Sequence, residues 1–531
     1  MKPQSRRAAA TAVVAPAGGA TRAPRCHRAR IRRRTAVGVP ALVMLAVGLW
    51  GLDRGGMWRD EAVSLQVGRR TVPQIWLLLH DVDAVHGLYY LLVHAVLAVH
   101  PGEVVLRLPS VCAAAVTAAL VAALGTRLAR PRVGLWAGLL YAVAPMAGHY
   151  AQEGRSYALV AAGATGATLL FVQAVQRGSS RSWAAYGAVL GLTCWLHEFA
   201  VLLLCAHAVS LALGRVGGRT WRGWGCAASA VLVSLVPMVL VSRGQAAQVA
   251  WLRRPTAVTA EELLRGFLGP SGAVYAVCLG LASVGLVGLF GRRGEITLVG
   301  VALPLTVVPP VVLMLASQAS PLFVDRYVLY ALSGAPLLVA AGAERVAGMV
   351  ARPAGDGRFR RHPMSQSRLV TLTGVLAIAL AFLHQLPVLR ADRNPGTRPD
   401  DLGAVSRVTA RELMPGDAVL FLPAHARNVA LTYPGAFRGA RDVVLVEGAA
   451  GSGTLYGREA GPREVRRRLE RLDRVWVVAD PSLLAGRWSP RRPTERAKLA
   501  VLQAEFAGRE QVRRGGMVVR LYVRKPMRPR H

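Results

Sequence analysis

Long apolar segments separated by short polar breaks fill most of the first 390 residues of the chain. A helix needs roughly 20 apolar residues to cross the hydrocarbon core of a bilayer, and most of these segments approach that length. We therefore predict an α-helical polytopic membrane protein with about eleven transmembrane helices. The predicted spans are 37–53, 106–126, 133–149, 155–176, 183–198, 199–213, 223–242, 273–290, 296–316, 327–349 and 369–389.

The pattern changes after residue 390, where short helix-like and strand-like segments alternate. Helical patterning is found at 402–413, 463–472 and 495–506. Short apolar runs typical of buried strands are found at 418–422, 443–446, 475–478 and 517–523. This alternation predicts a small α/β domain. The glycine-rich stretch 448–457 opens no helix, so we interpret it as a loop and not as a nucleotide site.

Arginine is concentrated in the linkers between the apolar segments. The chain carries a formal net charge of +36, and 53% of its residues are hydrophobic. Such basic chains often bind nucleic acid, but the placement of the charge and the lack of a nucleic-acid motif argue against that partner. The positive-inside rule places the basic linkers in the cytoplasm, with the N-terminus inside and the C-terminus outside. These linkers are 127–132, 177–181, 214–222, 291–293 and 351–368.

The segment 86–99 tests this topology. It is apolar enough to resemble a span, but a crossing here would place the linker 127–132 outside and would separate Asp60 from Glu153. We therefore interpret it as an amphipathic helix along the outer interface. The predicted parts of the chain are a disordered basic cytoplasmic N-terminus (1–36), a transmembrane domain (37–390) with a first outer loop (54–105), and an extracytoplasmic α/β domain (391–531).

Acidic residues occur at two of the breaks. WRDE (58–61) follows the first predicted span, and QEGR (152–155) lies between the third and the fourth. Carboxylates at such depth cost free energy unless they are paired or functional, so two clusters on one face predict a single shared active site. The alternatives are a helix cap for the first cluster and a salt bridge between Glu153 and Arg155 for the second.

Five motifs follow one another along the chain. They are WRDEA (58–62), HGLYYLLVH (86–94), RLPS (107–110), YAQEGRSYAL (150–159) and DRY (325–327). In this order and spacing they resemble GT-C membrane glycosyltransferases of the family 39 type, which include protein O-mannosyltransferases and bacterial enzymes that use polyprenyl-phosphate sugars. The resemblance covers roughly residues 37–390. The second motif lacks the His-Pro-Pro start common in the family, a departure from the protein O-mannosyltransferase branch.

The resemblance implies a reaction and a donor. The implied enzyme is a membrane glycosyltransferase, and specifically a mannosyltransferase. It would transfer a sugar from a polyprenyl-phosphate donor to an acceptor hydroxyl on the extracytoplasmic face. The hydroxyl needs a base and the leaving phosphate needs positive charge, and a single displacement would invert the anomeric centre. The acceptor, a glycan or a protein, is left open.

The same resemblance implies the site residues. Asp60 takes the position of the family's base, Glu61 is its neighbour, and Glu153 takes the second acidic position with Gln152 beside it. Arg326 would bind the donor phosphate through its rigid fork of donors, the alternative being an arginine that only snorkels to the interface. Further donor-pocket candidates, each with an alternative role at the interface, are His86, Arg155 and Tyr157.

Two other outer segments carry polar residues. His197 and Glu198 lie at a further break and are candidates for the same site. Arg107, in the RLPS motif, is expected to hold the first outer loop through Asp81 or Asp83.

Metal binding is left open by the sequence. Asp60, Glu61 and Glu153 offer oxygen ligands for a divalent cation, but no dedicated run of ligands accompanies them, so no cofactor is assigned. The six cysteines lack CxxC spacing, which argues against a disulfide framework or a zinc site. We interpret them as small apolar packing residues.

The alternative function is a transporter or flippase of lipid-linked sugars. Transporters usually carry charges near the membrane midplane and paired broken helices, whereas the acidic residues here fall at one interface. A sensor or scaffold centred on the α/β domain is a third hypothesis, and it leaves the two acidic breaks unexplained.

Overall fold

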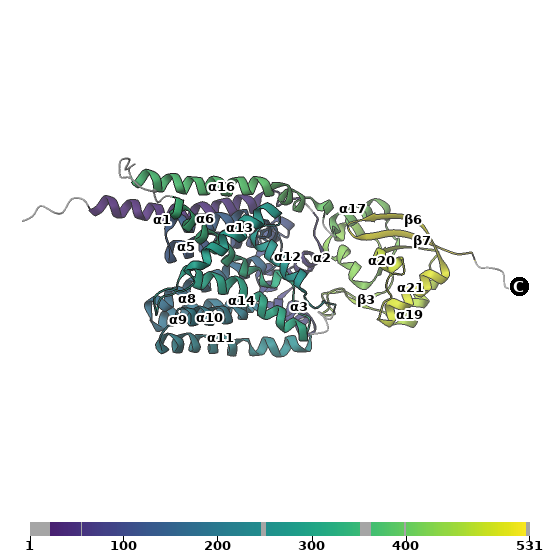
Figure 1. Cartoon of the computed structure of the whole chain (residues 1–531). Helices are drawn as coiled ribbons and strands as arrows, with labels where there is room; N and C mark the ends of the chain where they lie inside the picture. The colour runs from purple at the N-terminus through teal and green to yellow at the C-terminus, as the bar shows by residue number, and fades with distance from the viewer. Residues whose placement is uncertain (1–21, 55, 246–250, 351–362, 398–399, 527–531) are drawn as a thin grey trace, which may run out of the picture.

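A computed structural model of the chain describes residues 22–54, 56–245, 251–350, 363–397 and 400–526. It consists of a bundle of long helices and a smaller C-terminal domain at one end of the bundle (Figure 1). The bundle helices are α1 (Arg22–Leu49), α5 (Glu103–Leu128), α6 (Pro131–Val143), α8 (Tyr157–Arg177), α9 (Ser180–Leu196), α10 (Leu203–Leu213), α11 (Gly218–Gly244), α13 (Gly272–Gly285), α14 (Leu298–Ala319), α15 (Gly334–Val350) and α16 (Pro363–Asp392).

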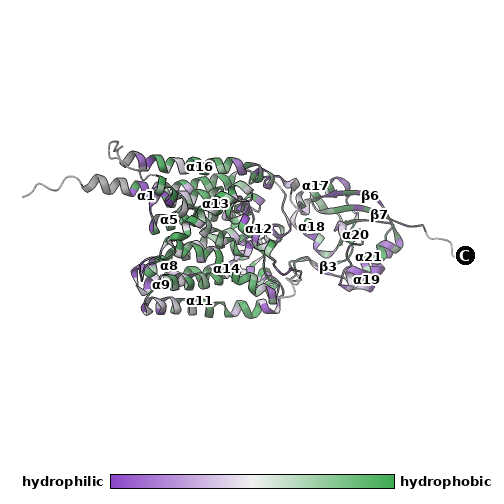
Figure 2. Cartoon of the chain, in the orientation of Figure 1, coloured by the Kyte–Doolittle hydropathy of each residue, from purple (hydrophilic) through white to green (hydrophobic). Residues whose placement is uncertain are grey.

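Six helices in the described part of the chain are long and apolar enough to cross a membrane. A seventh span results if α13 is joined to α12 (Ala257–Leu268), from which it is bent by 85°. Apolar residues cover the bundle helices, and hydrophilic ones gather toward its two ends (Figure 2). The other predicted spans fall on helices that are shorter or more polar, so the count of eleven stays a prediction.

Helix α1 begins at Arg22, well before the predicted start of the first span. The prediction that residues 1–36 are disordered is therefore wrong from Arg22 onward. The arginine and alanine residues in this stretch are good helix formers, so the span helix extends into it. Residues 1–21 lie outside the described part of the chain.

Basic linkers lie at the end of the bundle that is far from the C-terminal domain (Figure 1). Residues 351–362 of the predicted linker 351–368 are outside the described part of the chain. Arg130, between α5 and α6, and Arg132, in the first turn of α6, both form ion pairs with Glu344 near the end of α15. The Gly294 N–H donates to the Gly214 carbonyl at 2.8 Å, which joins two other linkers. We call this the basic end, and the opposite end, which carries the C-terminal domain, the domain end (Figure 1).

The first outer loop folds into three short helices, α2 (Arg59–Gly68), α3 (Val72–Asp81) and α4 (Gly87–Leu97). Helix α4, predicted to lie along the interface, has 11 residues and is too short to cross a bilayer. Its Tyr89 and Tyr90 are almost fully buried. They belong to an apolar cluster that also contains Met57, Leu402 and Phe421, so the loop and the C-terminal domain share one core.

The C-terminal domain is built on a five-stranded sheet in the order β2-β1-β5-β7-β6. Strand β1 is parallel to β2 and β5, while β7 is antiparallel to β5 and β6. The strands are β1 (Ala418–Leu422), β2 (Arg441–Asp442), β5 (Arg474–Ala479), β6 (Phe506–Arg514) and β7 (Met517–Arg524), and a separate pair is β3 (Leu445–Glu447) with β4 (Arg458–Glu459). The helices include α17 (Leu402–Glu412), α18 (Asn428–Thr432), α19 (Pro462–Glu470) and α21 (Pro493–Glu505). The predicted α/β domain is confirmed.

Two details of this domain differ from expectation. The predicted strand 443–446 is divided, because Val443 and Val444 lie between β2 and β3 as buried residues of irregular structure. Strand β6 was missed because most of its sequence, FAGREQVRR, is polar and solvent-facing. Such composition is typical of an edge strand that avoids pairing with other chains.

Cysteine labelling tests the predicted sidedness. In a background without the native cysteines, Arg463→Cys on α19 should react with a membrane-impermeant maleimide added to intact cells. Arg292→Cys at the basic end should react only after the membrane is permeabilised, because the positive-inside rule places that end in the cytoplasm. Labelling of residue 292 in intact cells together with protection of residue 463 would reverse the orientation.

Candidate active site

Helix α2 presents two adjacent carboxylates in different environments. Asp60 and Glu61 lie in its first turn, where the N-terminal end of the helix dipole favours negative charge. Successive helical residues point about 100° apart. The Asp60 side chain is 28% exposed, whereas Glu61 is completely buried. Asp60 is therefore accessible to a substrate, whereas Glu61 is enclosed in the core.

Glu61 is held by a buried arginine. Arg107 on α5 donates from Nε to Glu61 Oε1 at 2.8 Å and from Nη2 to Oε2 at 2.9 Å, and both side chains are fully buried. The Gly154 N–H also donates to Glu61 Oε1, at 2.9 Å. This carboxylate therefore connects α2, α5 and the segment that contains Glu153.

The predicted pairing of Arg107 with Asp81 or Asp83 is wrong. The planar guanidinium matches the two oxygens of Glu61, and its remaining donors reach the carbonyls of Leu52 and Gly56. Asp83 instead accepts a hydrogen bond of 2.8 Å from the Tyr90 hydroxyl. Arg107 does hold the first outer loop, as expected, but from within the core.

Asp60 faces a cation that comes from a distant part of the sequence. Arg326 lies in η5 (Asp325–Ser333), and its Nη2 is 3.4 Å from Asp60 Oδ2. Its Nε donates to the Tyr157 hydroxyl at 3.1 Å. The guanidinium carbon lies 5.6 to 5.9 Å from the ring centroids of Trp58, Tyr157 and Tyr327, within the range of cation–π attraction. Asp60 and Arg326 are thus partly exposed charges at the mouth of an aromatic site.

The Glu153 segment lies between α7 (Pro145–Ala151) and α8. Ser110 Oγ donates to the backbone carbonyls of Glu153 and Arg155 and fixes this bend. The Glu153 side chain is buried, and neither carboxylate oxygen accepts a hydrogen bond from any group that the structure describes. Burial raises the pKa of Glu153 to about 7. The alternative interpretation, a hydrogen-bonded salt bridge to Arg155, is not found.

Gln152 and Arg155 have other partners. Gln152 Nε2 donates to the carbonyls of Gly48 and Trp50, and Gln152 Oε1 accepts from Arg54. Its amide therefore anchors the bend to the end of α1. Arg155 donates from Nη2 to His86 Nε2 at 2.9 Å, and its Nη1 lies 3.4 Å from Ser64 Oγ on α2.

A group of aromatic rings completes the site. His197 lies between α9 and η2 (Glu198–Leu202), and its ring centroid is 6.2 Å from that of His86, 5.8 Å from Tyr157 and 4.7 Å from Tyr327. The structure therefore brings His197 to the site. Tyr327 belongs to the DRY motif but was not predicted as a site residue. Only its position beside Arg326 in the sequence could have indicated that it lies at the site.

Metal binding by the carboxylates is the point that the sequence leaves open. No group of three His, Cys, Asp or Glu residues that could hold a metal ion occurs in the described ranges. Both Glu61 oxygens accept hydrogen bonds from Arg107, so Glu61 is not available to join Asp60 and Glu153 as a ligand of a divalent cation. The five cysteines that the structure describes are free thiols, two of them buried.

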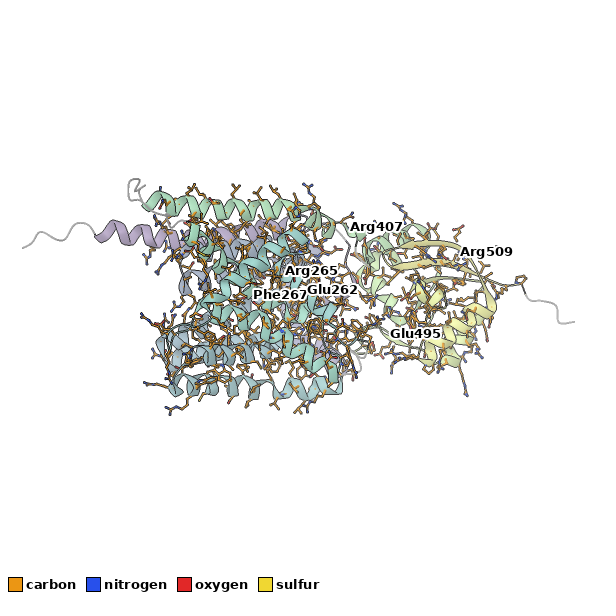
Figure 3. All side chains as sticks on the ribbon, viewed as in Figure 1. Glu262, Arg265, Phe267, Arg407, Glu495 and Arg509 are labelled. Atoms are coloured by element: carbon orange, nitrogen blue, oxygen red, sulfur yellow. The ribbon has the colours of Figure 1, made fainter. Side chains whose placement is uncertain are left out.

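An apolar groove and two further cavities lie along the bundle, and one of them borders Asp325, the neighbour of Arg326. A cavity of about 340 Å³ beside Asp325 is lined by Met146 and Phe323 and by Glu262, Leu263 and Gly266 of α12. Gly266 and Phe267 also line a smaller cavity, which adjoins an apolar groove of about 340 Å³ between α6, α13, α15 and α16. Figure 3 shows Glu262, Arg265 and Phe267 on α12, within the bundle and toward the C-terminal domain.

The sequence matches one family along part of its length. The family of dolichyl-phosphate-mannose-protein mannosyltransferases matches residues 87–242. That region includes Glu153, Arg155 and His197 but neither Asp60 nor Arg326. No curated protein sequence matches the chain significantly.

Solved structures match most of the chain. ArnT from Cupriavidus metallidurans in the apo state superimposes with a TM-score of 0.59 at 15% identity, over 91% of this chain and 97% of ArnT. This is the GT-C fold. ArnT bound to undecaprenyl phosphate gives a TM-score of 0.56 at 13% identity, over 92% of this chain and 98% of ArnT. The predicted fold class, a multi-pass membrane protein of the GT-C glycosyltransferase type with a small C-terminal α/β domain, is confirmed.

The different roles of Asp60 and Glu61 are testable by stability. Glu61→Gln leaves Arg107 buried without its charged partner, and breaking a buried pair costs about 3–5 kcal/mol. Asp60→Asn, one residue away, should change stability by no more than about 0.5 kcal/mol, because partly exposed pairs contribute little. Thermal unfolding of purified protein in detergent measures both. Equal losses in the two variants would contradict the assignment of Glu61 to a purely positional role.

Proposed function

We propose that this protein is a membrane glycosyltransferase that transfers a sugar, specifically mannose, from a polyprenyl-phosphate donor to an acceptor hydroxyl at the domain end of the bundle. The pair formed by Asp60 and Arg326 is the observation that supports this proposal most directly. These side chains are 266 residues apart in the sequence, and both remain partly exposed where the bundle meets the C-terminal domain. A carboxylate beside a cation is the minimum that this reaction needs, because one group receives a proton and the other receives negative charge.

Arg326 is suited to the leaving phosphate. Its guanidinium is always charged and offers several donors in one plane, which matches phosphate oxygens. Trp58, Tyr157 and Tyr327 surround it and limit its contact with water, so its interaction with an anion is stronger than in bulk solvent. The Tyr157 hydroxyl, hydrogen-bonded to Arg326, is a further group near the phosphate position.

Asp60 is suited to activate the acceptor. The acceptor hydroxyl would give its proton to the Asp60 carboxylate while its oxygen forms a bond to C1 of the sugar. The bond from C1 to the phosphate oxygen breaks at the same time, and the lipid phosphate leaves with the electron pair beside Arg326. One such displacement inverts the anomeric centre. The exposure of Asp60 allows an acceptor to reach it, which the buried Glu61 does not allow.

The other predicted site residues divide into two groups. Glu61 and Gln152 position the site, because their polar atoms are committed to Arg107, Arg54 and backbone groups. Glu153 differs, since a buried carboxyl group without a hydrogen-bond partner is costly. A hydroxyl of the bound sugar would satisfy it.

His86 and Arg155 form the wall of the site next to Glu153. They are hydrogen-bonded to each other, and Arg155 also contacts α2 through Ser64. The charge of Arg155 and the donor groups of both side chains support the predicted place in the donor pocket. Tyr157 accompanies them, with its ring 5.8 Å from the Arg155 guanidinium carbon.

The apolar groove accounts for the lipid part of the donor. Its lining is almost entirely aliphatic or aromatic, and it opens between α13 and α16, whose outer surfaces are exposed. It adjoins a small cavity lined by Gly266, and Gly266 also lines the cavity beside Asp325, the neighbour of Arg326. A polyprenyl chain in the groove would therefore place its phosphate near the guanidinium. By the positive-inside rule the basic end is cytoplasmic, so this reaction would occur on the extracytoplasmic face.

Donor class can be tested with purified protein. A polyprenyl-phosphate mannose should support transfer to membrane-extract acceptors, because the groove and Arg326 together fit a lipid phosphate. GDP-mannose alone should not, since neither the bundle nor the loop at 448–457 shows a nucleotide-binding pattern in the sequence. Transfer from GDP-mannose without any polyprenyl phosphate would contradict the proposal.

Separate readouts of donor binding and turnover test the two charged groups. Asp60→Asn should lower turnover by about 10²–10⁴-fold, the usual contribution of a general base, while donor binding survives. Arg326→Ala should weaken donor binding as well, because it removes a charge-assisted contact to phosphate.

Matched controls come from the same chain. Asp53→Asn removes an exposed carboxylate just before the first outer loop, and Arg509→Ala removes an exposed arginine from β6, on the side of the C-terminal domain away from the bundle (Figure 3). Both should retain wild-type binding and turnover. Near-normal turnover of Asp60→Asn would show that Asp60 only caps α2.

A further inference from the structure

A second cavity lies at the basic end, opposite the proposed active site. It measures about 470 Å³ and is formed by α1, the start of α6 and the start of α16. Its lining residues are Ile31, Arg32, Thr35, Ala36, Arg130, Pro131, Arg132, Leu135, Ser367, Arg368, Thr371 and Leu372. The proposed transferase reaction assigns no role to this cavity.

The polar side of this cavity has an excess of positive charge. Four arginines line it, and Glu344 is paired with two of them, Arg130 and Arg132. Arg132 is also fixed by the Trp136 ring, 5.9 Å from its guanidinium carbon. Arg32 and Arg368 lie on exposed surfaces of α1 and α16. Helix α6 begins at Pro131, so the positive end of its dipole adds to the same field.

The other side of this cavity is apolar and continues toward the membrane. Ile31 and Leu372 line it and are 49% and 64% exposed. Farther along α16, toward its C-terminal end, lies a row of exposed leucines at Leu376, Leu380 and Leu383. Helix α16 is long and apolar enough to cross a membrane, and this row would then face lipid. The cavity thus combines a cationic head with an apolar path along one helix.

We propose that this cavity is a binding site for an anionic phospholipid of the surrounding membrane. The arginines and the start of α6 would hold the headgroup phosphate, and an acyl chain would lie along the leucines of α16. Basic pockets between transmembrane helices bind anionic lipid headgroups in this way. Free phosphate would leave the apolar side uncovered, and the sugar donor acts at the opposite end of the bundle.

Native mass spectrometry of the full-length protein tests this site. Wild-type protein should retain phosphatidylglycerol in preference to phosphatidylcholine with the same acyl chains. The double variant Arg32→Gln/Arg368→Gln should lower the retained phosphatidylglycerol by about tenfold, because each arginine near a lipid headgroup contributes several-fold to binding. The control Arg219→Gln/Arg222→Gln removes the same charge from exposed positions at the start of α11 and should retain wild-type binding.

Thermal unfolding in lipid nanodiscs gives a second measurement on the same variants. Phosphatidylglycerol should raise the unfolding temperature of the wild type and of the control more than that of the double variant. Three results would overturn the proposal: no preference for phosphatidylglycerol in the wild type, an equal loss in the control, or the same stabilisation by inorganic phosphate alone.

Discussion

Glu61 and Arg107 hold helix α2 in place, and the rest of the proposed site depends on that position. The pair is bidentate and fully buried, and Glu61 also accepts from the Gly154 backbone. A buried pair of this kind is tolerated only with near-complete hydrogen bonding. Its directionality therefore specifies how α2, α5 and the Glu153 segment meet. Asp60 occupies its place because its neighbour is locked into the core.

The C-terminal domain is part of this arrangement. The Leu402 N–H donates to the Met57 carbonyl at 2.9 Å, and Asn428 on α18 donates to the Arg59 carbonyl at 3.1 Å. One donor is a backbone N–H and the other is a side-chain amide, and the two carbonyls that accept lie on both sides of the α2 start. The domain also binds Glu103 through the Tyr433 hydroxyl, and Glu103 lies one helical turn before Arg107. Domain and membrane bundle thus share the segment that carries the proposed base.

Much of this organisation could be predicted from the sequence because its signals are local. Apolar length indicates spans, and alternating short segments indicate the α/β domain. The acidic breaks indicated Asp60 and Glu153, and the DRY motif indicated Arg326. The partners could not be predicted in this way. Arg107 had several carboxylates within reach of the same loop, and only the packing of α2 against α5 selects Glu61. Helix α12 was missed because it is short and amphipathic and lies beside the span at a sharp bend.

The sequence separation between Asp60 and Arg326 has a consequence for biosynthesis. When α5 has joined the bundle, Asp60 and the Glu61–Arg107 pair can already be in place, yet the cation arrives only after α14 has been synthesised. The start of α17 is held by a hydrogen bond from the Asp401 N–H to the carbonyl of Gly515. This bond can form only after Gly515 has been synthesised. A nascent chain that stops before these segments holds a base with no partner for the leaving group. The proposed active site therefore needs segments from α2 through η5 to be synthesised before its two charges can meet.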